Sequence, residues 1–300
     1  MTIQVGAFEV LEPVPSLRRP RLLVALQPWI DVGAVGTMAL SFLEEAWGAQ
    51  TLAQLGQPGT FYDFTRYRPT LLRKEGRREI VVPNTVLRYA QPEGDQDWLF
   101  LHALEPHSHG EEYVRSLVEV MKYLGVHQYC LIGSMYAPVP HTRAAVATGS
   151  ASEQPLQERL RGLGVRESTY EGPTTIIALA IEEARQSGVE TVTLLVQLPA
   201  YAQLERDYRG LCAILELLSG LYGLSLQLDD ARREGERQYA ALGDVVHKDP
   251  RLKGWVQELE AVYDAEAAPP RPAEEPPSLS PELESFLQEM EKGWNGPGAN

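Results

Sequence analysis

The chain has 300 residues, of which 44% are hydrophobic and 23% are charged, and its net charge at pH 7 is −14. This length allows one large domain, with or without a small appendage, because domains hold roughly 100–200 residues each. The composition is that of a folded globular protein. The acidic balance disfavours binding to nucleic acid and docking on anionic membranes, since both depend on clustered lysine and arginine.

Two cysteines, Cys130 and Cys212, are too few for a disulfide framework or a four-cysteine zinc site. Both lie in apolar segments, which predicts buried thiols in a reducing compartment. The first residues lack the basic and apolar regions of a signal peptide. No segment approaches the roughly 18 apolar residues of a membrane span. We therefore expect a cytoplasmic protein without a membrane partner.

Residues 1–200 alternate between predicted strands and helices, which predicts parallel strands joined by crossover helices. We therefore expect an α/β fold with a doubly wound, mostly parallel sheet. The predicted strands cover residues 21–27, 99–104, 126–132 and 189–196, and the predicted helices cover 32–47, 110–124 and 174–187. Between the first two strands, residues 70–74, 79–82 and 86–89 look antiparallel. Ser108 and Glu111 form a capping-box pattern at the start of the second helix.

The C-terminal third has a different sequence pattern from the alternating strands and helices before it. Residues 204–263 have a helical pattern and form a predicted helical subdomain after the 1–203 core. Residues 264–280 are acidic and rich in proline, which is typical of an extended linker. A tail helix over 281–293 is predicted from Pro281 at its start, with Ser280 as its N-cap. Its apolar stripe must be buried on this chain or on a partner, and consists of Leu283, Phe286, Leu287 and Met290.

The signatures of common enzyme classes are missing from the sequence. There is no phosphate-binding loop of the Walker type, no G-x-S-x-G motif and no H-E-x-x-H motif. Gly33 and Gly36 follow a strand as in a dinucleotide fingerprint, but the third glycine is absent. We expect no cofactor. Gly33 still belongs to a strand–helix turn whose free N–H groups can hold an anion.

Three polar clusters follow predicted strands, at the sheet edge where open α/β proteins bind ligands. In the first, Asp31 is a candidate catalytic carboxylate or a helix N-cap. In the second, Glu105 and His107 offer an acid/base pair, or Pro106 shapes a turn with solvated histidines. We expect no metal here, because no third ligand has suitable spacing.

The third cluster contains His141, Thr142 and Arg143 after two prolines. Arg143 is placed to clamp an anion and His141 to move a proton. The alternative is that Arg143 pairs with a structural carboxylate such as Glu105 or Glu171.

Three further residues are candidate ligand contacts, Thr148, Glu171 and Thr174. Thr174 either seats an anion at a helix N-terminus or caps that helix. The aromatic and arginine-rich segment 61–69 indicates packing within the chain or between subunits.

Seven short segments, taken in order, resemble the bacterial branch of the proteasome assembly chaperone two-like family. They are Pro28-Trp29-Ile30-Asp31-Val32-Gly33, Phe61-Tyr62-Asp63-Phe64, Arg68-Pro69, Glu105-Pro106-His107, Val139-Pro140-His141-Thr142-Arg143, Thr148-Gly149 and Tyr170-Glu171-Gly172-Pro173-Thr174. The resemblance covers residues 20–263. It implies a core similar to nucleoside phosphorylases and hydrolases, a helical C-terminal subdomain, and homo-oligomers, often trimers. The family is ATP-independent, and its eukaryotic and archaeal relatives help to assemble the proteasome core.

Two departures from the family pattern matter. Relatives that dock on the proteasome can end in a hydrophobic–Tyr–any-residue tripeptide, whereas this sequence ends in Gly298-Ala299-Asn300. Docking through such a tail is therefore not expected. Ile30 also stands where the family commonly has a polar residue.

Two functions fit these observations. The first is an oligomeric interaction or assembly-chaperone-like protein, which itself forms a homo-oligomer, expected to be a trimer, and binds a protein partner through the tail helix. The second is a nucleoside- or phosphate-ester-binding protein, or a hydrolase or phosphorylase-type enzyme, with a pocket around Glu105, His141 and Arg143. The sequence leaves catalysis undecided, and we favour the first function.

Overall fold

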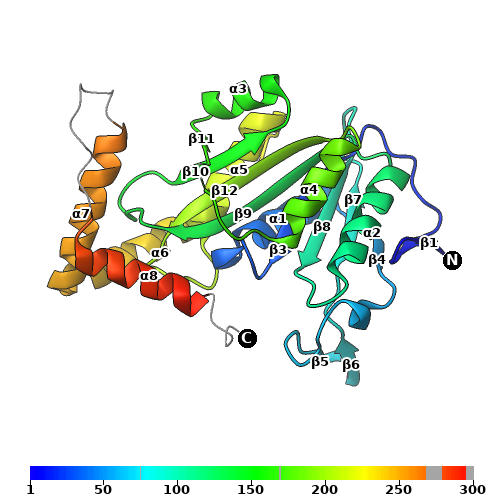
Figure 1. The fold of residues 1–300 in the computed structure, drawn as a ribbon, viewed down its shortest axis with the longest axis horizontal. Coiled ribbons are helices and arrows are strands. Elements are labelled where there is room, and N and C mark those ends of the chain that lie inside the picture. The colour runs from blue at the N-terminus through cyan, green and yellow to red at the C-terminus, as the bar shows by residue number, and fades with distance from the viewer. Residues whose placement is uncertain (75, 169, 268–278, 295–300) are drawn as a thin grey trace.

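The computed structural model describes residues 1–74, 76–168, 170–267 and 279–294. Ten strands form one mixed sheet in the order β1-β2-β4-β7-β8-β3-β9-β12-β10-β11 (Figure 1). Its strands are β1 (Thr2–Val5), β2 (Phe8–Leu11), β3 (Arg21–Gln27), β4 (Gln50–Leu55), β7 (Val86–Ala90), β8 (Trp98–Leu104), β9 (Gln128–Ala137), β10 (Val146–Ala151), β11 (Arg166–Glu167) and β12 (Glu190–Pro199).

The centre of the sheet is parallel and its flanks are mostly antiparallel. The four central strands β8, β3, β9 and β12 run parallel to one another. All four were predicted, because their nearly continuous apolar sequences suit strands that are covered on both faces. Strands β1, β2, β4 and β7 continue the sheet antiparallel on one side, and β10 pairs antiparallel with β12 on the other. The α/β class is confirmed, but the predicted mostly parallel sheet is mixed, because its parallel pairing is concentrated at the centre and its flanks are largely antiparallel.

Two helices cover each face of the sheet (Figure 1). One face packs against α1 (Val35–Trp47) and α5 (Tyr208–Tyr222), and the other against α2 (Gly110–Tyr123) and α4 (Ile176–Gln186). The remaining helix of this region, α3 (Gln154–Gly162), lies beside β10. Both cysteine thiols are buried in this core, as predicted.

The start of α2 corrects the predicted capping box. Ser108 donates its hydroxyl proton to the Thr60 carbonyl at 2.6 Å instead of accepting from the helix. His109 occupies the N-cap position with a φ of 54° and makes no side-chain cap. The short loop is therefore held by segment 58–61 rather than by reciprocal capping.

Helices α6 (Asp229–Lys248), α7 (Pro250–Ala267) and α8 (Pro281–Trp294) follow α5. The apolar side of α5 belongs to the main core, and α6 packs on α5. The predicted linker over 264–280 overlaps the end of α7, and its residues 268–278 lie outside the described part. The division at residues 203 and 204 stays a prediction.

The tail helix α8 folds back on its own chain. Ser280 accepts the Leu283 N–H at 3.4 Å, so the predicted N-cap is confirmed. Leu283 is only 1% exposed, and the Phe286 ring lies 4.7 Å from that of Trp255 in α7. Leu287 is half-buried, and the side chain of Met290 lies outside the described residues.

A separate two-stranded hairpin projects from the molecule at the other side from α8 (Figure 1). It consists of β5 (Thr70–Lys74) and β6 (Arg77–Val81), and each of its strand residues is exposed. No helix in the described ranges is long and apolar enough to cross a membrane.

Candidate functional site

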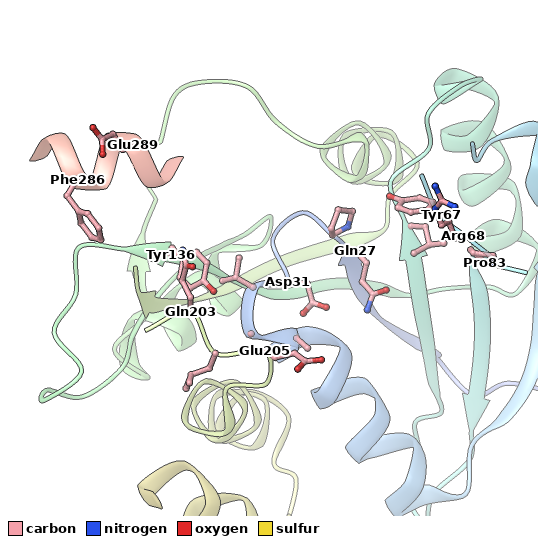
Figure 2. Close-up of a pocket in the computed structure, with 16 residues that line it drawn as sticks. Gln27, Asp31, Tyr67, Arg68, Pro83, Tyr136, Gln203, Glu205, Phe286 and Glu289 are labelled. Atoms are coloured by element: carbon pink, nitrogen blue, oxygen red, sulfur yellow. The ribbon is translucent and has the colours of Figure 1, made fainter. Parts of the chain in front are cut away.

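A cavity of about 970 Å³ opens at the carboxyl ends of the four central strands. Gln27 ends β3, Leu104 ends β8, Tyr136 lies near the end of β9, and residues 203–205 follow β12. Figure 2 shows Gln27 and Asp31 in the middle, with Tyr67, Arg68 and Pro83 at one end and Phe286 and Glu289 of α8 at the other. Open α/β sheets bind ligands at this edge, so the pocket lies where the polar clusters were predicted to meet.

Asp31 lies at the floor of this pocket and caps α1. Its Oδ1 accepts the N–H groups of Gly36 and Thr37 at 2.7 and 3.2 Å, and its Oδ2 accepts the Thr37 hydroxyl at 2.6 Å. The side chain is buried, and burial raises its pKa. Asp31 therefore satisfies N–H groups in the first turn of α1, as a capping side chain does, although Ala34 occupies the N-cap position, and both carboxylate oxygens are engaged.

Gly33 also lines the pocket and meets a residue that the sequence did not single out. Its φ is 61°, and its carbonyl accepts the Asp207 N–H at 2.8 Å. A Cβ at this position would lie 2.8 Å from the Asp207 Cβ, so the close approach requires glycine. Asp207 is 1% exposed and in turn accepts the Gly210 N–H at 2.7 Å and the Tyr239 hydroxyl at 2.9 Å.

Glu105 does not line the pocket. Its Oε1 accepts the N–H of Ile176, the first residue of α4, at 2.9 Å. Its Oε2 is buried without a hydrogen-bond partner, and burial raises the pKa of this carboxyl. A carboxylate at a helix N-terminus is favourably placed for the helix dipole. Glu105 therefore fills the anion seat that was predicted at the start of α4.

The same contact corrects the interpretation of Thr174. The helix begins two residues later than this threonine, and the residue at the N-cap position, Thr175, makes no side-chain cap. Thr174 and Glu171 are both exposed. The carboxylate of Glu105, brought from a distant part of the sequence, replaces the expected hydroxyl cap.

His107 belongs to an aromatic cluster next to the pocket. Its Nδ1 accepts the Asp63 N–H at 3.2 Å, and its ring lies 4.6 Å from the Tyr67 ring. Burial lowers the pKa of His107, which favours the neutral imidazole that accepts this hydrogen bond. Phe61 and Tyr62 are buried against Tyr113, so for these two rings the structure shows packing within the chain, one of the two predicted alternatives.

The third predicted cluster faces the C-terminal helices. The His141 N–H and Nδ1 both lie 2.7 Å from the Tyr201 hydroxyl, and burial lowers the pKa of this histidine. Thr142 donates its hydroxyl to Glu260 in α7. Figure 1 places α7 at the end of the molecule opposite the hairpin.

Arg143 is engaged by carboxylates of α7. It binds Asp264 through two hydrogen bonds of 2.8 Å and Glu260 through one of 3.2 Å. These hydrogen bonds, above all those to Asp264, raise the pKa of Arg143. A structural ion pair was one of the two interpretations of Arg143, but its partners are residues of α7 and not Glu105 or Glu171.

The candidate residues are therefore only partly brought together. Asp31 and Gly33 line the pocket, whereas Glu105, His141 and Arg143 are not among its lining residues. Thr148 lies within β10, opposite Leu195 of β12. Within the described ranges, no group of three His, Cys, Asp or Glu side chains is arranged to hold a metal ion.

Several lining residues were missed from the sequence, among them Tyr136, Gln203 and Glu205. The same rule that selected the polar clusters points to them, because residues 203–205 follow the predicted strand over 189–196. Strand β12 runs three residues beyond its predicted end, and β9 runs five beyond its own.

Solved structures with this fold come from bacteria and archaea. A PAC2 family protein from Streptomyces avermitilis is 25% identical, with a TM-score of 0.71, and the match covers 79% of this chain and 99% of that one. The proteasome-assembly chaperone homologue Rv2125 from Mycobacterium tuberculosis is 23% identical, with a TM-score of 0.70 and the same coverage. PbaB from Pyrococcus furiosus, an archaeal proteasome activator, is 15% identical over 79% of this chain and 97% of its own, with a TM-score of 0.62.

No curated protein matches the sequence significantly. The sequence model of the PAC2 family matches residues 25–246, which is most of the sheet, all four covering helices and most of α6. This agrees with the resemblance carried by the seven short segments. The chain therefore belongs to the PAC2 family.

Proposed function

We propose that this protein is a homo-oligomeric, assembly-chaperone-like factor that binds folded protein subunits and does not turn over a small molecule. The observation that carries the proposal is the projecting hairpin. Five large apolar side chains of residues 71–82 are exposed there, Leu71, Leu72, Ile80, Val81 and Val82. Apolar side chains that cluster on a surface mark protein-binding sites.

The hairpin is also poorly supported by its own chain. Among the residues that the structure describes, strands β5 and β6 pair only with each other. An isolated two-stranded hairpin is at best marginally stable in water. Binding of a protein surface to the hairpin supplies the missing burial and stabilises its shape.

Two further features support the proposal. The candidate carboxylates Asp31 and Glu105 and the candidate anion clamp Arg143 are held by hydrogen bonds within the chain, as structural groups are. The fold is shared with a proteasome-assembly chaperone homologue and with an archaeal proteasome activator. The trimer that the family resemblance implies is the oligomer we expect, and the cytoplasm is the expected location.

Analytical ultracentrifugation tests the proposal. The purified protein is run alone and mixed with purified α-subunits of a proteasome core. We expect a species of several chains in the first run and a faster boundary that contains both proteins in the second. A single 33.4 kDa species in the first run would contradict homo-oligomerisation. The absence of a mixed boundary would contradict the assembly role.

A small-molecule-binding function is the second candidate, and the observation that favours it is the pocket of about 970 Å³. A thermal-shift screen with nucleosides, nucleotides, phosphate and sugar phosphates tests it. A ligand at 100 times its dissociation constant stabilises the native state by about 2.7 kcal/mol. A shift that is lost in Arg68→Ala, an exposed lining residue, would favour this function over the first.

A further inference from the structure

The hairpin has two chemically different faces. In the register of β5 and β6, Leu71 pairs with Ile80 and Arg73 pairs with Arg78. Side chains two residues apart lie on the same face of a strand, and residues directly opposite each other share that face. Leu71, Arg73, Arg78 and Ile80 therefore form one surface, here called the basic face.

The charge of the hairpin is opposite to that of the rest of the molecule. Residues 66–82 contain six basic and two acidic residues, a net charge of +4, which leaves −18 for the rest of the chain. On the other face, Lys74 lies 3.6 Å from Glu79. Within the part of the chain that the structure describes, Arg73 and Arg78 have no ion-pair partner. The basic face thus offers two uncompensated guanidinium groups beside two exposed aliphatic side chains, since Leu71 is 56% and Ile80 67% exposed.

Residues of matching composition line the pocket from its middle, where Figure 2 shows Glu205 below Asp31, to its α8 end. They are Leu204, Glu205, Phe286 and Glu289, and we call these four residues the acidic wall. Glu205 and Glu289 are exposed, and neither has an ion-pair partner among the described residues. Leu204 and Phe286 supply the apolar component. Arginine and aromatic side chains are enriched at protein interfaces of this kind.

Within one chain the two surfaces do not meet. The basic face lies on the hairpin, whose flanking residues Arg68 and Pro83 stand at the opposite end of the pocket from Phe286 and Glu289 (Figure 2). The hairpin and α8 also lie on different sides of the molecule (Figure 1). Two basic faces repel each other, so two hairpins do not pair. A contact between the basic face and the acidic wall therefore joins two chains.

We propose that the basic face of one chain docks on the acidic wall of a second copy of the same chain. This inference rests on the proposed homo-oligomer and names its interface. Such a contact uses two different surfaces, so it leads from one copy to the next and closes a ring when the rotation between copies permits. The aliphatic pair packs against Leu204 and Phe286, and the two arginines pair with Glu205 and Glu289.

Charge reversal with rescue in the same chain tests the interface. The variants are Arg73→Glu with Arg78→Glu on the basic face, and the four-fold variant that also carries Glu205→Arg and Glu289→Arg. The matched control is Lys74→Glu with Arg77→Glu, which reverses two charges on the opposite face of the same hairpin. Molar mass is measured by light scattering on the full chain, and thermal melting verifies folding.

We expect the double variant to fall from the wild-type mass to the 33.4 kDa of a single chain. The four-fold variant recovers the wild-type molar mass, because both charges of each pair are exchanged. The control variant has the wild-type molar mass throughout. A double variant that stays oligomeric, or a four-fold variant that stays monomeric, overturns the interface while the homo-oligomer stands. A wild-type protein that is itself monomeric overturns the homo-oligomer and the interface together.

Discussion

Asp207 connects the turn at Gly33, which lines the pocket, with α5 and α6. Replacing Asp207 tests whether these contacts stabilise this side of the pocket. The carboxylate accepts the Gly210 N–H at the start of α5 and the Tyr239 hydroxyl of α6, at 2.7 and 2.9 Å. Its backbone N–H reaches the Gly33 carbonyl in the turn that lines the pocket. We expect Asp207→Ala to destabilise the whole fold, since α5 covers one face of the sheet.

The magnitude follows from the two lost hydrogen bonds. Replacing an N-cap aspartate by alanine costs about 1 kcal/mol. The Tyr239 hydroxyl then loses its acceptor in a buried position, which costs about 1–3 kcal/mol. The sum is about 2–4 kcal/mol. For a chain of this size each kcal/mol shifts the melting temperature by about 2–4 °C, so we expect a decrease of roughly 5–15 °C.

A double-mutant cycle with Tyr239→Phe isolates the interaction. Unfolding of the wild type, Asp207→Ala, Tyr239→Phe and the double variant is followed by urea titration. A hydrogen bond to a charged group predicts a coupling energy of about 1.5–3 kcal/mol. Additive effects of the two substitutions, to within about 0.5 kcal/mol, would refute the assigned contact. A decrease below about 2 °C for Asp207→Ala would refute the structural role.

Three further predictions concern the sheet edge and the tail. Glu105→Ala removes the acceptor for the Ile176 N–H and should lower the free energy of unfolding by about 1 kcal/mol, as measured by thermal unfolding. Glu105→Gln retains an acceptor oxygen for this N–H. Burial raises the Glu105 pKa, so its proton-linked stabilisation is present below the unfolded pKa of about 4.3 and is lost as pH rises through the folded pKa. The free energy of unfolding of Glu105→Gln should therefore increase relative to that of the wild type as the pH rises from about 4 to about 7. A difference between the two proteins that stays constant over this range would contradict the expectation. Leu283→Ala should speed hydrogen exchange of α8 without changing the main melting temperature, because that side chain is buried where the tail helix docks. A lower main melting temperature would instead make α8 part of the core. Gly133→Ala should cost at least about 1–3 kcal/mol in urea unfolding, because its Cβ would lie 2.0 Å from the Ile30 carbonyl oxygen, and an unchanged midpoint would contradict this close approach.

The central layers of the fold could be predicted because their signals are local. Residues 21–27 are apolar nearly throughout, and residues 114–124 repeat with the helical period, so β3 and α2 follow from neighbouring residues alone. The flanking strands gave weaker signals. Strand β4 has an irregular burial pattern, and β10 contains Gly149, whose added Cβ would lie 2.2 Å from the Thr193 carbonyl oxygen. Such a strand depends on its neighbours more than on its own propensity.

The site was harder to predict because its contacts are distant in sequence. Glu105 was correctly placed at the edge of the sheet, but its partner is 71 residues away. Of the two interpretations of Arg143, the structure shows the structural ion pair, yet the carboxylates that it binds lie 117 and 121 residues further along. No periodicity connects such pairs, and only the packing of α4 and α7 brings them together.

In this molecule, charged groups that have a partner within the chain serve the structure, whereas charged groups without an ion-pair partner are available for function. Asp31, Glu105 and Arg143 each have a partner within the chain and hold the start of a helix or a loop against α7. A charge committed in this way loses its partner if it binds a ligand, which costs the desolvation of the group left behind. Arg73 and Glu205, which have no ion-pair partner in the described part of the chain, carry no such cost. The free charges, and not the buried polar clusters that the sequence brings to attention, are therefore the ones available to a protein partner.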